Sequence, residues 1–319
     1  MIASARTNGD TLQPRIMRDP SIERVLDTGD RKTSTAMESI LVATDFSEGA
    51  ARALERAVLL TNEVAPARLT VLHADSPSSM PALLRRRDGD REPQSATTRI
   101  RELARHVRER TGIRVDERIV SGKTVPTLRR FAADADLTIV GTSDVRPLRD
   151  FTIGSTVQRL ARRLERPMLV VNRHARARYR QVVVAVDLAT DPATALASAR
   201  ALAPGAKLNL LHAYRAPYEP QLHYAGVSEE AIYSHRAEAR MAAASALTDL
   251  VLSHLPESDV RLLLTHGYPV PTLLQKASDV GADLLVVRKS EPSLVRELLV
   301  ESVTQQVIGR SRCDVLVVP

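Results

Sequence analysis

The chain repeats one succession of short apolar segments, and this internal repeat restricts the folds open to it more than any other feature. Each copy opens with an apolar run that ends in an aspartate, residues 39–45 in the first copy and 181–187 in the second. Further landmarks keep the same order and nearly the same spacing: 69–73 with 208–212, 122–128 with 267–273, 136–140 with 283–287, and 167–171 with 314–318. Such agreement indicates two copies of one structural unit.

The repeated segments have the composition of strands in a parallel sheet. Most are rich in β-branched residues and apolar at consecutive positions, as strands are when both faces of their sheet are covered. The segments between them have the period of amphipathic helices. Helices are predicted at 48–63, 95–111, 125–133 and 155–163 in the first repeat and at 192–202, 228–255, 270–280 and 302–310 in the second. This alternation predicts an α/β fold with a parallel sheet.

Each repeat ends on an apolar strand, and no helical segment follows to cover its edge. An exposed hydrophobic strand edge pairs readily with another strand. We therefore expect the last strands to pair with one another or with another chain, and we predict an internal pseudo-dimer. The predicted organisation is a disordered arm at 1–37, the first repeat at 38–172, a basic, solvated linker at 173–180 and the second repeat at 181–319.

Composition excludes several classes of protein. The single cysteine, Cys313, cannot form a disulfide framework or a thiolate metal cluster, which fits a reducing cytoplasm. The first 37 residues lack the apolar core of a secretory signal, and no stretch reaches the ~18 apolar residues of a membrane helix. The net charge of +7 permits nucleic acid binding, but charges of both signs alternate along the chain and aromatic residues make up only 3%. We expect a cytoplasmic protein with neither membrane nor nucleic acid as a partner.

Candidate ligand-binding residues lie where the predicted strands end, which is where open parallel sheets bind ligands. In the first repeat Gly141 ends a strand, and Gly154 and Ser155 open the next predicted helix. Glycines let backbone N–H groups approach a phosphate, a hydroxyl adds a donor, and a helix N-terminus favours an anion. Asp45, at the end of the first strand, is suited to accept from a ribose hydroxyl or an adenine amino group. Together these residues predict a nucleotide site.

With these motifs the sequence resembles the universal stress protein family in its tandem two-domain form. The resemblance rests on the run 40–47, on a Gly-x2-Gly-x9-Gly-Ser pattern that begins at Gly141, and on the closing strand 167–171. It extends over residues 38–319 and implies five parallel strands in each repeat, an adenine nucleotide alpha hydrolase-like fold, and pairing through the last strands. Some family members bind ATP at this motif, whereas others lack the motif and do not. Since Met37 stands where family members usually begin, we hypothesise that translation starts there.

The resemblance also implies the residues that contact ATP or another adenine nucleotide. The adenine and ribose contacts it implies are Ala43, Thr44, Asp45 and Ala74, and the phosphate and ribose contacts are Gly141, Thr142, Gly154, Ser155 and Thr156. The chain departs from the motif at Asp144, which replaces the second glycine. A carboxylate about 4 Å from one phosphate charge costs about 1 kcal/mol in water and about 4 kcal/mol at an effective dielectric constant of 20. Arg146 and Arg149 stand nearby in the sequence to offset this repulsion.

The second repeat has lost most of this motif. The counterparts of the three glycines are Arg288, Glu291 and Glu301, while Ser302 and Asp187 match the first repeat. A glutamate at the start of a helix satisfies the helix dipole from within and repels a phosphate. We interpret the second repeat as a structural copy. The alternative is a different ligand in a cavity lined by the 228–255 helix and by Tyr214, Tyr218 and Tyr224, for which core packing is the simpler prediction.

No catalytic or metal-binding constellation is evident in the sequence. His73 and His212 occupy the same strand end in both repeats without a carboxylate or cysteine cluster, so we expect them to be structural. Cys313 begins an apolar strand, and we expect it to be buried. The leading hypothesis is a non-enzymatic regulator whose first repeat binds an adenine nucleotide and so changes the surface shown to protein partners. A nucleotide-independent scaffold and a slow ATPase are the alternatives, and a homodimer of the whole chain is left open.

Overall fold

The computed structural model of the chain describes residues 37–63, 67–76, 95–142, 156–254, 260–289 and 302–319. They belong to one compact unit, Thr35–Pro319. Apart from Met37, the arm predicted at 1–37 lies outside the described residues. None of the helices described is both long enough and apolar enough to cross a membrane.

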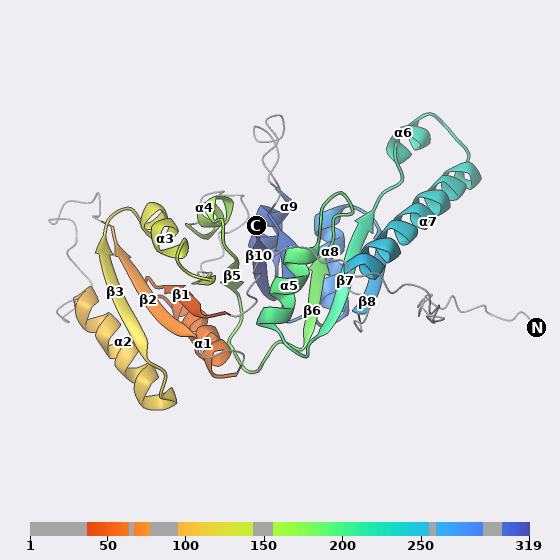
Figure 1. Cartoon of the computed structure of the whole chain (residues 1–319). Coiled ribbons are helices and arrows are strands. Elements are labelled where there is room, and N and C mark those ends of the chain that lie inside the picture. The colour runs from red at the N-terminus through yellow and green to blue at the C-terminus, as the bar shows by residue number, and fades with distance from the viewer. Residues whose placement is uncertain (1–36, 64–66, 77–94, 143–155, 255–259, 290–301) are drawn as a thin grey trace, which may run out of the picture. The chain divides into compact units, whose positions relative to one another are not determined.

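The first repeat alternates strand and helix throughout (Figure 1). Its elements are β1 (Ser39–Ala43), α1 (Glu48–Glu63), β2 (Arg68–Asp75), α2 (Ala96–Thr111), β3 (Val115–Ser121), α3 (Thr124–Ala132), β4 (Leu137–Gly141), α4 (Thr156–Arg163) and β5 (Met168–Val171). Side-chain caps explain where helices begin: Ser47 Oγ accepts from Ala50 N at 3.2 Å, and Ser95 Oγ accepts from Thr98 N at 3.2 Å.

The second repeat follows the same plan with one addition. Its elements are β6 (Gln181–Ala185), α5 (Ala193–Leu202), β7 (Lys207–Tyr214), α6 (Glu219–Tyr224), α7 (Glu229–His254), β8 (Val260–His266), α8 (Pro269–Asp279), β9 (Leu284–Arg288), α9 (Val303–Arg310) and β10 (Asp314–Val318). The short helix α6 was not predicted, whereas every predicted helix is present with both ends within one residue of the expected position.

All the strands join one ten-stranded sheet in the order β3-β2-β1-β4-β5-β10-β9-β6-β7-β8. Neighbouring strands within each repeat are parallel, and only β5 and β10 meet antiparallel among the described pairs. Leu169 lies opposite Leu316, its own counterpart in the repeat, so the two halves are related by a local two-fold axis between these residues. The predicted α/β fold and the pairing of the last strands are confirmed.

Alternate strand residues face two apolar cores, one on each side of the sheet. Ile40 and Val42 belong to the core under α1, α2, α5 and α7, whereas Leu41 belongs to the core under α3, α4, α8 and α9. Each core runs through both repeats, because Leu169 and Leu316 lie in the first and Val170 and Val315 in the second. Both cores are therefore continuous across the seam between the repeats.

The segment between the repeats is exposed for most of its length and buried near its end. Tyr179 is only 3% exposed and belongs to the first of the two cores. The backbone N–H groups of Arg180 and Gln181 donate to the Asp283 carboxylate at 2.7 and 3.1 Å. We predicted a solvated linker from its arginines, which are exposed, and did not foresee that the aromatic ring of Tyr179 is buried among them.

Candidate functional site

The carboxyl ends of β1, β2 and β4 meet at one edge of the sheet. β1 lies between β2 and β4, and the order in which the chain visits the strands reverses between β1 and β4, so this is the topological switch point of the first repeat. Ala43 closes β1 opposite Leu72 of β2, and Gly141 closes β4. The edge therefore gathers six predicted site residues, namely Ala43, Thr44, Asp45, Ala74, Gly141 and Thr142.

Local hydrogen bonds hold the loop that follows β1. The N–H of Thr44 donates to the carbonyl of Leu72 at 2.9 Å, and its Oγ1 accepts from the N–H of Phe46 at 3.0 Å. Asp45 is exposed, and its Oδ1 accepts from the N–H of Ser47 at 3.0 Å. A short polar side chain that binds the backbone two residues on stabilises a tight turn. The Asp45 carboxylate is thus held in a defined place at the sheet edge with an accessible surface.

An aromatic contact that the sequence did not reveal braces this loop. Phe46 has a left-handed backbone (φ 63°), its ring lies 4.6 Å from the His73 ring, and the guanidinium carbon of Arg99 lies 4.2 Å from the Phe46 ring centroid. His73 Nδ1–H donates to the carbonyl of Thr44 at 2.9 Å. His212 makes the same bond to Val186 in the second repeat at 2.9 Å, so both histidines serve the fold, as predicted. Arg99 adds positive charge at Phe46, the residue that follows Asp45.

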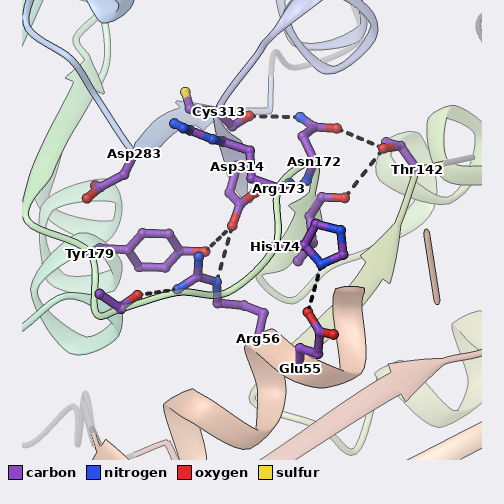
Figure 2. A network of polar contacts seen from close by, with 12 residues as sticks. Glu55, Arg56, Thr142, Asn172, Arg173, His174, Tyr179, Asp283, Cys313 and Asp314 are labelled. Carbon is purple, nitrogen blue, oxygen red and sulfur yellow. Dashed lines mark hydrogen bonds and ion pairs between the residues drawn. The ribbon is translucent and has the colours of Figure 1, made fainter. Parts of the chain in front are cut away.

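Gly141 is required by the packing of α1 against β4. A Cβ atom at this position would lie 1.9 Å from the carbonyl oxygen of Gly49, in the first turn of α1. Further along α1, Nη2 of Arg52 donates to the carbonyl of Thr142 at 3.0 Å. The Thr142 hydroxyl donates to Oδ1 of Asn172 at 3.0 Å (Figure 2). The start of α1 therefore packs closely on the end of β4, and the Arg52 guanidinium places a positive charge there.

The phosphate side of the predicted site is described only in part. Thr156 is the first residue of α4 and is half-buried. Gly154 and Ser155 lie outside the described residues, as do the residues on which the charge argument rests, Asp144, Arg146 and Arg149. Within the described ranges, no three side chains of His, Cys, Asp or Glu gather into a group that could hold a metal ion.

The equivalent edge of the second repeat is occupied by a side chain. Arg288, the counterpart of Gly141, closes β9; its Nε donates to the carbonyl of Pro319 at 3.2 Å and its Nη1 to the carbonyl of Asp191 at 3.4 Å. Asp191 is the counterpart of Gly49, so a guanidinium lies where the first repeat has two glycines. Ser302 is used within its own helix, because its Oγ accepts from Gln305 N at 3.3 Å. Glu291 and Glu301 lie outside the described residues.

Two of the three tyrosines before α7, Tyr218 and Tyr224, do not pack in the core, contrary to the prediction, whereas Tyr214 is half-buried. Tyr218 and Tyr224 are 75% and 97% exposed, at the two ends of the unpredicted helix α6. Glu219 anchors α6, since its carboxylate accepts from Arg236 Nε at 2.7 Å and from His266 Nε2 at 2.8 Å. Burial raises the pKa of Glu219, but the hydrogen bonds from Arg236 and His266 outweigh it and hold that pKa below the ordinary value. Sequence patterns missed this anchor because its partners come from α7 and β8.

Comparisons with known proteins agree with this architecture. The model of the universal stress protein family matches the chain twice, over residues 37–172 and 178–319. A Thermus aquaticus protein described as "Universal stress protein in QAH/OAS sulfhydrylase 3'region" is 38% identical over 130 residues, which make up 40% of this chain and 87% of that protein.

Solved structures match over most of the chain. A universal stress protein from Archaeoglobus fulgidus aligns with 89% of this chain and 97% of its own at 16% identity and a TM-score of 0.65. A putative universal stress protein from Pseudomonas aeruginosa aligns with 89% of this chain and 94% of its own at 18% identity and a TM-score of 0.60. A universal stress protein solved in complex with cAMP aligns with 43% of this chain and 97% of its own at 25% identity and a TM-score of 0.33.

Proposed function

Because the chain belongs to the universal stress protein family, we propose that it is a non-enzymatic stress-response regulator that binds one adenine nucleotide, in its first repeat only. The proposed site is the edge formed by β1, β2 and β4 together with the start of α4. Its residues are Ala43, Thr44, Asp45, Ala74, Gly141, Thr142, Gly154, Ser155 and Thr156. We place the protein in the cytoplasm, in keeping with its single, buried cysteine, Cys313.

The contrast between Gly141 and Arg288 carries the proposal. At the first edge Gly141 adds no side chain beyond the backbone of α1 that packs against it, the Asp45 carboxylate is exposed, and Arg52 donates to the carbonyl of Thr142. These features suit a ligand with hydroxyl or amino donors at one end and negative charge at the other. At the second edge the Arg288 guanidinium spans from Pro319 to Asp191 and fills the corresponding position. The edge of the first repeat is thus suited to a nucleotide, whereas the edge of the second repeat is filled by its own arginine side chain.

Replacing Asp45 by alanine is expected to weaken binding of ATP, ADP and AMP by about 10- to 100-fold, because hydrogen bonds to charged groups contribute about 1.5–3 kcal/mol. Isothermal titration of the full chain with each nucleotide, and with cAMP, measures the change. Asp187→Ala is the matched control, since Asp187 occupies the equivalent position in the second repeat and its Oδ1 makes the same kind of turn, to Ala189 N at 3.0 Å. We expect it to bind like the wild type.

Two results would contradict the proposal. Equal weakening by Asp45→Ala and Asp187→Ala would show that the repeats do not differ in function. Absence of any binding up to millimolar nucleotide would leave the nucleotide-independent scaffold as the function. Phosphate release by the purified chain that is lost in Asp45→Ala would identify an ATPase instead.

Replacing Asp144 by glycine is expected to raise the affinity for ATP at least about fivefold, because the change removes a repulsion of about 1 kcal/mol or more from the phosphates. AMP carries fewer phosphate charges and should gain less. The ratio of the ATP and AMP dissociation constants in the variant and the wild type measures this effect, and an unchanged ratio would place Asp144 away from the phosphates.

A scaffold role has one observation in its favour. Tyr218, Tyr224, Tyr233, Met241 and Tyr268 are exposed, and all but Tyr268 lie on or beside α6 and α7. Protein-binding sites expose large apolar side chains, and these residues are candidates for such a site. The titration described above distinguishes the two functions, because a nucleotide-dependent regulator must bind an adenine nucleotide and a scaffold need not.

A further inference from the structure

The ladder that joins the two repeats does not by itself determine which repeats pair. Met168, Leu169 and Val170 of β5 lie opposite Val317, Leu316 and Val315 of β10, and every one of these residues is apolar. A first repeat facing the first repeat of another chain would form the same kind of ladder, as would two second repeats. The apolar seam therefore supplies stability without selecting a partner.

A buried polar network beside the ladder is not symmetric (Figure 2). Asp314, the first residue of β10, is 0% exposed, and its carboxylate accepts three hydrogen bonds and forms one ion pair. The donors are the hydroxyl of Tyr179 at 2.7 Å and the backbone N–H groups of Asn172 and Arg173 at 2.9 and 3.1 Å. The ion pair is with Arg56, whose Nε lies 3.3 Å from the carboxylate. Arg56 belongs to α1 of the first repeat, and Asn172 and Arg173 follow β5, so the network crosses from one repeat to the other.

Arg56 is also buried, although its Nε makes no hydrogen bond. Its side chain is 6% exposed, its Nη1 donates to the carbonyl of Ala177 at 2.9 Å, and its guanidinium carbon lies 4.2 Å from the centroid of the Tyr179 ring. Burial raises the pKa of Asp314 even though Tyr179 and Arg56 lower it, so the network does not fully offset the cost of placing this charge in the interior. Because a buried ion pair contributes little net stability compared with apolar residues of similar size, stability alone does not explain this pair.

The positions related to this network by the repeat carry no charge. Arg56 corresponds to Ser198, Asp314 to Pro167, Tyr179 to Met37, and Asn172 to Pro319. The alignment through α1 and α5 has no gap, since buried Leu54 and Leu60 correspond to buried Leu196 and Leu202. The ion pair therefore occurs once per pair of repeats.

We propose that Arg56, Asp314 and Tyr179 form a recognition element that makes the first repeat fit a second repeat and reject another copy of itself. In a pair of first repeats, Pro167 would stand where Asp314 is, and two Arg56 guanidiniums would be buried without a counter-charge. In a pair of second repeats, Asp314 would face Ser198 and be buried without a cation. Uncompensated buried charges are strongly unfavourable, so both wrong pairings are excluded.

The inference assigns a role to the degenerate second repeat that does not depend on nucleotide binding. The edge of its β10 pairs specifically with β5. Because like repeats do not pair, several copies of the chain cannot join into open assemblies through them. Exchange of whole repeats between two chains would preserve the ion pair and is not opposed by it. The eight-residue linker predicted at 173–180 favours pairing within one chain through a high effective concentration.

The test replaces the network in the full-length chain in two ways. Arg56→Met with Asp314→Leu removes both charges and keeps apolar bulk. Arg56→Ser with Asp314→Pro copies the residues that the related positions already carry. Each protein is unfolded, refolded at increasing concentration and analysed by sedimentation velocity, with Glu219→Leu plus Arg236→Met as the control, because that change removes an ion pair remote from the seam.

We expect the wild type and the control to refold to one species at every concentration. Both network variants should form larger species, and the mass fraction of these species should rise with protein concentration to about tenfold or more above that of the wild type. This is the change expected if the network favours pairing of unlike repeats over like repeats by about tenfold or more. Refolding of both variants to the wild-type species across the whole range would overturn the proposal. Failure of both variants to fold would also overturn it, since the network would then be a requirement for stability and not for selection.

Discussion

Asp314→Leu is expected to lower the free energy of unfolding by about 3–5 kcal/mol, the loss typical of removing one partner from a buried ion pair. The change leaves the Arg56 guanidinium buried beside an apolar side chain, and it deprives the Tyr179 hydroxyl and the N–H groups of Asn172 and Arg173 of their acceptor. Adding Arg56→Met to this variant should restore about 2 kcal/mol or more, because the uncompensated charge is then gone.

The sign of the second change makes this prediction decisive. Arg56→Met should destabilise the wild type, where it leaves Asp314 without its cation, and stabilise the Asp314→Leu variant. Urea denaturation of the wild type, both single variants and the double variant measures the full cycle. Additive losses would mean that Arg56 and Asp314 contribute independently, and the network would then have no role in matching the repeats.

Gly141→Ala is expected to cost about 3 kcal/mol or more, at or above the upper end of the usual range for overpacking. The new Cβ would lie 1.9 Å from the carbonyl oxygen of Gly49 and 2.9 Å from the backbone nitrogen of Ala50. Neither atom can move by a change of rotamer, so the start of α1 must shift away from β4. The same shift would disturb the contact of Arg52 with Thr142, and nucleotide affinity should fall with stability.

Gly309→Ala is the matched control for this change. Gly309 lies in α9, and a Cβ there would meet its nearest atom, Nε2 of Gln158, at 3.7 Å, an ordinary contact. Alanine is favoured over glycine within a helix, so this variant should be neutral or more stable by up to about 1 kcal/mol. Equal thermal midpoints for Gly141→Ala and Gly309→Ala would show that α1 does not press on β4 as described.

Most of the fold could be predicted because its signals are local or repeated. The duplicated apolar runs indicate parallel strands, and capping residues such as Ser95 and Ser302 mark helix starts to within one residue. Helix α6 was missed because six residues contain too little periodic pattern, and its anchor, Glu219, depends on Arg236 and His266 from other elements. The burial of Tyr179 was missed because polar neighbours surround it in the sequence.

The candidate site was predictable to a smaller extent. Parallel strands bring their carboxyl ends to one edge, so the meeting of Asp45 with Gly141 follows from order and topology alone. The left-handed backbone of Phe46 and the stacking of Arg99 on its ring have no sequence signature, because both arise from packing between β1, β2 and α2. The partnership of Arg56 with Asp314 joins opposite ends of the chain, and only the pairing of β5 with β10 brings it about.

The number of adenine nucleotides held by one chain tests the central claim most directly. Native mass spectrometry of the full-length protein, with denaturation to identify the released compound by mass, gives that number after equilibration with excess ATP or AMP. We predict one nucleotide per chain, lost in Asp45→Ala and retained in Asp187→Ala. Two nucleotides per chain would contradict the loss of the second site to Arg288, and none at millimolar ligand would contradict nucleotide binding altogether.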